Sequence, residues 1–220
     1  MIDMKLLVHK KREELELGVQ IMGDLVCAAL RKSMDCLRRQ EVALARQIIE
    51  EDVPINEQRR MLEQQCLLVL AAHQPAAQDL REIGASMEIV SDLERIGDYA
   101  ADVAQVVIDG RGLSYPEALV EQVNAVAAKG VSMLSETLRA YKAGDAQLAR
   151  ATAQSDDEVD AQEKETIGLI LDMMRGDPDG VTAGAHLLWA VHIYERVADR
   201  ATNIAERVIF AATGETVELN

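Results

Sequence analysis

The sequence predicts an all-α protein with six helices, arranged as two pseudo-symmetric three-helix bundles. Long stretches rich in Ala, Leu, Glu, Gln and Arg, which favour helices, alternate with a few short clusters that hold most of the Pro and Gly residues. An eleven-residue segment of the first half returns in the second half, which indicates a duplicated unit. With 220 residues, of which 49% are apolar, the chain is long enough to bury a core.

Breaks in the helical pattern divide the chain in order. Most breaks contain Gly or Pro, the residues that commonly end or begin a helix. Five breaks leave room for six helices, the last of which begins after residue 180. The breaks lie at residues 39–40, 73–75, 110–116, 143–144 and 176–180.

The internal repeat sets the domain organisation. ERIGDYAADVA at 94–104 returns as ERVADRATNIA at 195–205, an offset of 101 positions with five of the eleven residues identical. Upstream, the segment 52–56 matches 156–160 at an offset of 104. We therefore expect one repeat in residues 1–112 and a second in residues 113–220. Three helices bury an apolar stripe poorly on their own, so the halves should pack together as one domain.

An acidic stripe runs along the third predicted helix. Glu94, Asp98 and Asp102 follow one another at four-residue steps, while the apolar Leu93 and Ile96 lie on the opposite, core-facing side. Like charges at this spacing cost a few tenths of a kcal/mol per pair. A solvated face with local arginine pairs is the simple explanation. The same acidic spacing on the partner helices favours a binding site instead.

Hairpin geometry brings these acids together, because residues equally distant from a turn lie at the same level in antiparallel helices. A turn near residue 74 places Asp52 between Glu94 and Asp98, and a turn near residue 177 places Asp156 and Asp160 level with the acids of the last helix. The predicted first site comprises Asp52, Asn56, Glu94 and Asp98, and the predicted second site comprises Asp156, Asp160, Glu195 and Asp199.

The ligand types define the kind of ion. Carboxylate and amide oxygens with no lysine nearby suit hard or borderline cations such as magnesium, manganese, calcium, iron or zinc. Bridging carboxylates would allow more than one ion at each site. His192, three residues before Glu195 on the same stripe, either adds an imidazole ligand or only forms a hydrogen bond.

We expect the two predicted sites to differ in their affinity for metal. Asn56 stands where the second site has a carboxylate, so the first site should hold metal more weakly. Pro54 leaves two alternatives for the local backbone: a helix that begins after an Asp52 cap, or a longer helix that contains the proline. An Asp52 cap would be engaged by backbone amides and less free to bind metal. We expect the second site to be the better one.

Composition excludes several classes of protein. A net charge of −15 with one Trp, four Tyr and one Phe opposes nucleic-acid binding. Three cysteines without a CxxC pair and the lack of any eighteen-residue apolar run indicate free thiols in a cytoplasmic protein. We find no nucleophile–base pair, Gly-rich phosphate loop or dinucleotide fingerprint, so we expect a binding protein rather than an enzyme.

Three motifs resemble the PhoU family over essentially the whole chain. They are the acidic ExxxD pairs within LERIGD (Glu94, Asp98) and YERVAD (Glu195, Asp199), and the pattern QPxxxDLR at 74–81. The pairs Asp156/Asp160 and, less closely, Asp52/Asn56 match the acidic motif of the preceding helix. The resemblance implies two three-helix bundles that bind multinuclear clusters, of iron or zinc in some members.

The same resemblance implies a regulatory role. Members of this family repress the phosphate-starvation response when phosphate is plentiful, and they link the ATPase subunit of the phosphate ABC transporter to the sensor histidine kinase. A homodimer that meets the membrane only through its partners is also implied.

A second class of function is a carboxylate-bridged di-iron enzyme or iron store built in a helical bundle. Such sites take Glu-x-x-His motifs from helices that point into the bundle core. No Glu-x-x-His occurs in this sequence, and the acidic stripe is predicted to face away from the core. The regulatory reading is therefore preferred.

Overall fold

The computed structural model describes residues 4–75 and 77–219, and every regular element in this part of the chain is helical. A 3-10 turn, Pro178–Gly180, precedes the last helix. The helices in chain order are α1 (Met4–Arg39), α2 (Val42–His73), α3 (Ala77–Asp109), α4 (Glu117–Ala143), α5 (Ala146–Ala153), α6 (Asp156–Gly176) and α7 (Val181–Thr213).

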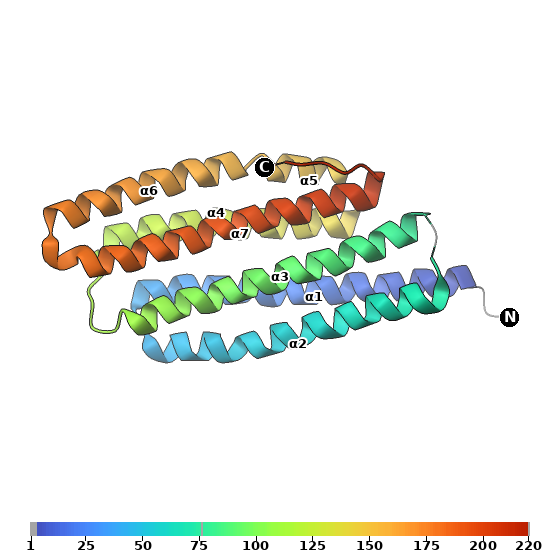
Figure 1. The fold of residues 1–220 in the computed structure, drawn as a ribbon, viewed down its shortest axis with the longest axis horizontal. Helices are drawn as coiled ribbons and strands as arrows, with labels where there is room; N and C mark the ends of the chain where they lie inside the picture. Colours follow the sequence, from blue (N-terminus) through green and yellow to red (C-terminus); the bar gives the residue numbers. More distant parts are fainter. Residues whose placement is uncertain (1–3, 76, 220) are drawn as a thin grey trace.

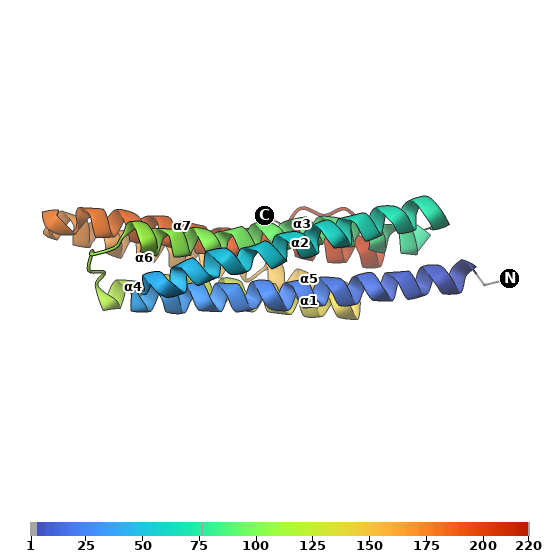
Figure 2. The ribbon, with the colours of Figure 1, turned by 90° about the horizontal axis from the view of Figure 1, so that it is seen from below.

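Two bundles of the same design make up the molecule. α1, α2 and α3 pack together in the first bundle, and α4, α5, α6 and α7 pack together in the second. α3 and α7 lie side by side and antiparallel in the middle (Figure 1). Seen after a 90° turn, α1 and α4 lie in one layer and α3 and α7 in the other (Figure 2). The predicted all-α fold of two pseudo-symmetric three-helix bundles is confirmed.

The fifth predicted helix is divided into α5 and α6. The chain leaves the helix at Gln154 and Ser155 and starts a new one at Asp156. The first turn of α6 holds three acidic residues, and the positive end of the helix dipole favours negative charge there. Asp156 therefore lies at a helix end, whereas its counterpart Asp52 lies inside a helix.

α2 takes the second of the two alternatives left open by Pro54. It runs without interruption from Val42 to His73, and Pro54 lies within it. The proline has no amide N–H to donate, so the carbonyl of Glu50 loses its usual helical partner. Asp52 is consequently not a helix cap, and its carboxylate faces the neighbouring helix instead.

The core forms along the faces that the sequence pattern predicts. Leu93 and Ile96 on α3 are fully buried, as are Ala201 and Ile204 on α7. The three cysteines are free and buried. No helix in the described part of the chain is both long and apolar enough to cross a membrane.

Residues 110–116 connect the two bundles. Tyr115 in this connection is buried, and its hydroxyl lies 3.1 Å from Nδ1 of His186 on α7, so the connection is anchored to the second bundle. The boundary between residues 112 and 113 falls within it and stays a prediction.

A buried hydroxyl pair joins the two bundles and gives the first testable prediction. Ser33 Oγ on α1 donates to Leu30 O at 2.8 Å and lies 2.9 Å from Tyr194 Oη on α7, so the tyrosine donates to the serine. Tyr194→Phe should lower the free energy of unfolding by about 1 kcal/mol, because it removes one buried hydrogen bond. Tyr194→Ala, which also removes the ring, should cost about 3–5 kcal/mol.

Urea unfolding measures both values, and the m value should not change. A Tyr194→Phe protein as stable as the wild type would show that ring packing alone joins α1 to α7 at this point.

Candidate metal centres

The second predicted site is a pocket between α6 and α7. The pocket has a volume of about 420 Å³ and is lined by all four predicted carboxylates: Asp156, Asp160, Glu195 and Asp199. Arg150 of α5 and Leu219 of the C-terminal tail also line it. The hairpin of α6 and α7 thus brings together the acids that the repeat pattern predicted to be level.

Two further side chains extend this site along the α6–α7 seam. His192 Nδ1 lies 3.4 Å from Glu163 Oε1 and 3.5 Å from Glu195 Oε2. One ligand atom from each of Glu163, His192 and Glu195 lies within 4.8 Å of the others, a spacing that one ion can bridge. His192 thus lies among the candidate ligands, as one alternative for this residue anticipates.

The carboxylates of the second site repel one another. Burial, followed by the charges of Asp199 and Glu163, raises the pKa of Glu195 to about 7. Burial and the neighbouring Asp199 and Asp160 raise the pKa of Asp156 to about 6. Glu195 Oε2 accepts no hydrogen bond from the described residues, although it is buried. A cation placed here would relieve this repulsion and give that oxygen a partner.

The donor set of the second site fits a divalent metal. Five carboxylates and one imidazole offer oxygen ligands for manganese or magnesium, together with one nitrogen that suits iron or zinc. One residue departs from the prediction of a site without lysine, because Lys164 Nζ lies 3.6 Å from Asp160 Oδ2. Lys164 is 74% exposed, so it can swing into solvent and does not block the pocket.

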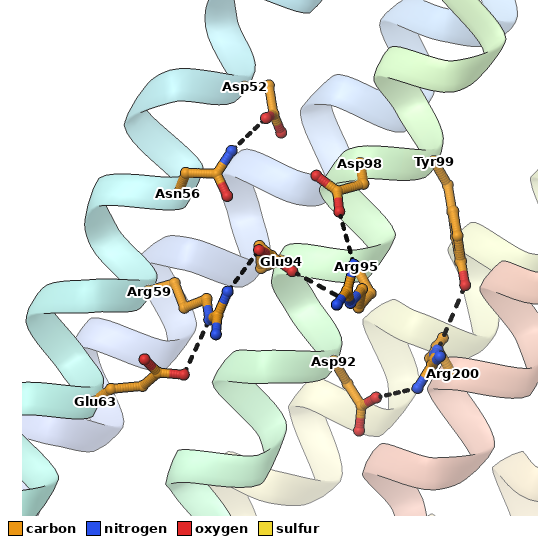
Figure 3. A network of polar contacts seen from close by, with 10 residues as sticks. All are labelled: Asp52, Asn56, Arg59, Glu63, Asp92, Glu94, Arg95, Asp98, Tyr99 and Arg200. Carbon is orange, nitrogen blue, oxygen red and sulfur yellow. Dashed lines mark hydrogen bonds and ion pairs between the residues drawn. The ribbon is translucent and has the colours of Figure 1, made fainter.

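The first predicted site lies between α2 and α3 (Figure 3). Asp52 sits against Gly97, where a Cβ atom would lie 3.4 Å from Asp52 Oδ1, so the predicted level between Glu94 and Asp98 is correct. The amide of Asn56 donates to Asp52 Oδ2. Asp52 Oδ1 is buried and has no hydrogen-bond partner among the described residues.

Arginines enter the first site from both sides. Arg59 on α2 donates to Glu94 Oε1 at 2.7 Å and to Glu63 Oε1 at 2.9 Å. Arg95 lies 3.7 Å from Glu94 Oε2 and 3.6 Å from Asp98 Oδ2. Glu94 is only 7% exposed, so the prediction that the acidic stripe faces away from the core is wrong for this residue. The guanidinium of Arg59 makes its burial tolerable.

Negative charge persists in the first site despite these arginines. Burial and the charges of Glu94 and Asp52 raise the pKa of Asp98 to about 6, although Arg95 opposes the shift. Burial also raises the pKa of Asp52, and the Asn56 amide counteracts it. Three carboxylates, one amide and a fixed guanidinium fit a metal ion less well than the donor set of the second site.

A polar cross-link separates the two sites. Arg200 on α7 donates to Asp92 Oδ1 on α3 at 3.0 Å and to the hydroxyl of Tyr99 at 3.5 Å. Arg196 lies over the Tyr99 ring, 4.8 Å from its centroid. Figure 3 shows this link beside the first site. Both acidic sites therefore flank one α3–α7 seam that arginines of α7 cross.

Comparison with known proteins identifies this arrangement. The PhoU domain family matches the chain twice, over residues 19–107 and 123–208. The chain belongs to the PhoU family. Each match includes one acidic hairpin, α2 with α3 in the first and α6 with α7 in the second.

Relatives and solved structures of the PhoU family agree over most of the chain. The protein named phosphate-specific transport system accessory protein PhoU homolog of Pseudomonas aeruginosa is 36% identical over 93% of this chain and 85% of its own length. The protein of the same name from Rhizobium meliloti is 33% identical over 88% of this chain and 81% of its own. The crystal structure of PhoU from Pseudomonas aeruginosa superposes with a TM-score of 0.89 at 33% identity, covering 94% of this chain and 99% of the other.

Arg59 and Glu163 lie outside the PhoU-family motifs but add charged side chains to these sites. Arg59 and Glu163 each lie three residues beyond the second member of an acidic pair, at Asn56 and Asp160. Both residues lie one helical turn beyond the pair, on the same face of the helix, so the helical spacing is the signal that identifies them. The motif ends at the second member of each pair and therefore does not include the charge that lies one turn further along each helix.

The raised pKa values predict how stability depends on pH. Glu195 and Asp156 have pKa values of about 7 and 6, above their ordinary 4.5 and 3.8. Between these limits the folded protein binds more protons than the unfolded chain, so the free energy of unfolding falls as pH rises. We expect the metal-free protein to be less stable at about pH 8 than at about pH 5.5, by on the order of 1 kcal/mol after solvent screening.

Urea unfolding with a chelator at both pH values measures the effect. Glu195→Gln is the control, because it removes the titrating group: this variant should be more stable than the wild type at about pH 8 and should depend less on pH. A wild-type protein that gains stability between these pH values would contradict the electrostatic description of the site.

Proposed function

We propose that the protein is a regulatory accessory component of phosphate-specific transport. Family membership over both repeats carries this proposal, and the relatives from Pseudomonas aeruginosa and Rhizobium meliloti are named as accessory proteins of that transport system. In this role the protein lowers phosphate uptake and represses the phosphate-starvation response when phosphate is plentiful.

The proposed mechanism is binding rather than catalysis. The protein links the ATPase subunit of the phosphate ABC transporter to the phosphate sensor histidine kinase, acting as a cytoplasmic homodimer that reaches the membrane only through these partners. The net charge of −15 supports contacts with basic protein surfaces and opposes contact with nucleic acid.

Metal binding at the second site is the other part of the proposal. The side chains that would hold the ions are Asp156, Asp160, Glu163, His192, Glu195 and Asp199. Bound divalent ions would neutralise the mutual repulsion of the carboxylates and tie α6 to α7. The tie favours the folded hairpin, because a ligand that binds only the folded state stabilises it.

The di-iron alternative rests on the group of Glu163, His192 and Glu195, since carboxylates and imidazole are also the ligands of di-iron enzymes. This group of residues differs from a di-iron site in its exposure to solvent. His192 is 53% exposed, although Glu163 and Glu195 are only 13% and 15% exposed, so solvent reaches this group at the α6–α7 seam, whereas di-iron sites are built inside a bundle. Oxygen consumption after addition of Fe(II) separates the two functions, and turnover would favour the enzyme.

A double variant tests metal binding at the second site. We define the second-site variant as Glu195→Gln/Asp199→Asn. Wild-type protein in manganese at about one hundred times the dissociation constant should gain about 2.7 kcal/mol of stability, and the second-site variant should gain none. Glu117→Gln/Glu121→Gln on the exposed face of α4 removes the same charge elsewhere and serves as the matched control.

Equilibrium dialysis with metal analysis and thermal unfolding provide the two measurements. Equal manganese content in the wild type and the second-site variant would reject the proposed metal centre.

A deletion strain tests the regulatory role. Loss of the gene should raise expression of phosphate-starvation genes in high phosphate, and the wild-type gene should restore repression. Pull-down of purified transporter ATPase or sensor kinase domain by the protein should give a specific complex. An unchanged starvation response together with failure to bind either partner would reject the proposed function.

A further inference from the structure

Arg59 and Glu163 occupy equivalent positions in the two repeats. The offset of 104 that relates 52–56 to 156–160 also relates position 59 to position 163, and the offset of 101 relates Glu94 to Glu195. The contacts agree with this alignment. Arg59 donates to Glu94 at 2.7 Å, and Glu163 lies in the group formed with His192 and Glu195. The same place in each hairpin therefore holds opposite charges.

We infer that Arg59 is a built-in cation that keeps metal ions out of the first site, so that only the second half of this chain loads metal. The statement about the second half rests on the proposed metal centre there. The statement about Arg59 rests on the first site alone. Arg59 and Glu163 are then the residues that decide which of the two similar hairpins binds metal.

The contacts of Arg59 make it a strong competitor for metal. Its Nη1 and Nε donate to carboxylates on both helices, Glu94 on α3 and Glu63 on α2, at 2.7 and 2.9 Å. Hydrogen bonds in which both partners are charged are about twice as strong as neutral ones. A guanidinium also keeps its charge at any ordinary pH, so it cannot give way by losing a proton, as a lysine or histidine ligand can.

A metal ion that binds Glu94 Oε1 would have to displace the Arg59 guanidinium, and it would then be repelled by that nearby positive charge. Arg59 is 32% exposed, so part of its side chain is held by the protein rather than by solvent. Two like charges a few Å apart repel strongly where water is partly excluded.

The other donors of the first site are also engaged within the protein. The Asn56 amide donates to Asp52, and Arg95 lies 3.6 Å from Asp98. An amide oxygen is a weaker ligand for a hard cation than the carboxylate that the second repeat has at this position. Each of the three carboxylates predicted for the first site thus faces a donor or a cation of the chain.

In the second site none of the described arginines donates to Glu195, although Arg150 lines the pocket and Lys164 lies 3.6 Å from Asp160. Glu163 adds a fifth carboxylate where the first repeat has Arg59, and His192 stands where the first repeat has Ser91. Oε2 of each of the equivalent glutamates, Glu94 and Glu195, is buried and accepts no hydrogen bond from the described residues, but only Glu94 has an arginine donor, Arg59, which donates to its Oε1. The first hairpin therefore holds a guanidinium against its glutamate where the second hairpin adds a carboxylate and an imidazole.

Loss-of-site variants give the first test. We define the first-site variant as Glu94→Gln/Asp98→Asn and measure bound manganese by equilibrium dialysis at fixed free manganese. The first-site variant should bind as much manganese as the wild type, and the second-site variant should bind none. Manganese loss in the first-site variant equal to that in the second-site variant would overturn the inference.

A gain-of-site variant gives the sharper test. Arg59→Glu/Asn56→Asp gives the first hairpin the acidic set of the second, and in the background of the second-site variant it should restore manganese binding. Adding Glu94→Gln should remove the binding again. Circular dichroism melts confirm that each variant is folded, and a folded protein that binds no manganese would overturn the inference.

The reciprocal change covers the case in which the gain-of-site variant does not fold. Glu163→Arg should lower the manganese affinity of the second site about 10–100-fold, with Glu165→Arg, on the exposed face of α6, as the matched control. Unchanged affinity in Glu163→Arg would overturn the inference. If the wild type binds no manganese, the proposed metal centre fails, and Arg59→Glu/Asn56→Asp alone decides the role of Arg59.

Discussion

α3 and α7 lie side by side and antiparallel, and each must bury the apolar side of a helix of 33 residues. This packing determines the direction in which the acidic sides of the two helices face. With one side of each helix committed to the core, the acidic side of α3 turns toward α2 and that of α7 turns toward α6. The two sites consequently lie on opposite flanks of one seam. Their relation by pseudo-symmetry follows from the packing of the central pair (Figure 1).

The two hairpins reduce the repulsion among their carboxylates in different ways. In the first, α2 runs through Pro54, Asp52 lies inside the helix, and an arginine supplies the positive charge. In the second, the helix breaks before Asp156, so that acid lies in a first turn where the helix dipole offsets part of its charge. Some repulsion remains in both hairpins, as the raised pKa of Asp98 in the first and of Glu195 in the second indicates. The first half thus pairs its buried glutamate with an arginine, and the second half leaves the corresponding glutamate without one.

Much of this architecture could be predicted from the sequence because it depends on local signals. Glycine and proline positions mark four of the five predicted breaks, and the repeat specifies how many helices belong to each bundle. Hairpin symmetry then places Asp52 beside Gly97 without any structural knowledge. The break between α5 and α6 at Gln154 and Ser155 was missed; like the predicted break at residues 39–40, it contains no glycine or proline. The burial of Glu94 was missed for a different reason: it depends on Arg59, whose reach across to α3 is a tertiary contact that periodicity does not encode.

The C-terminal tail gives the second pocket a property that the first site lacks. Residues after Thr213 leave the helix at Gly214 and run back, so that Leu219 lines the pocket. Leu219 N–H donates to Glu206 at 2.8 Å, Arg150 donates to the exposed Glu215 at 3.1 Å, and Val217 and Leu219 pack against the core. A short non-helical segment near the end of the described chain opens at a lower free energy than the helices beneath it. One wall of the pocket is therefore formed by a non-helical segment that can open without unfolding of α6 or α7.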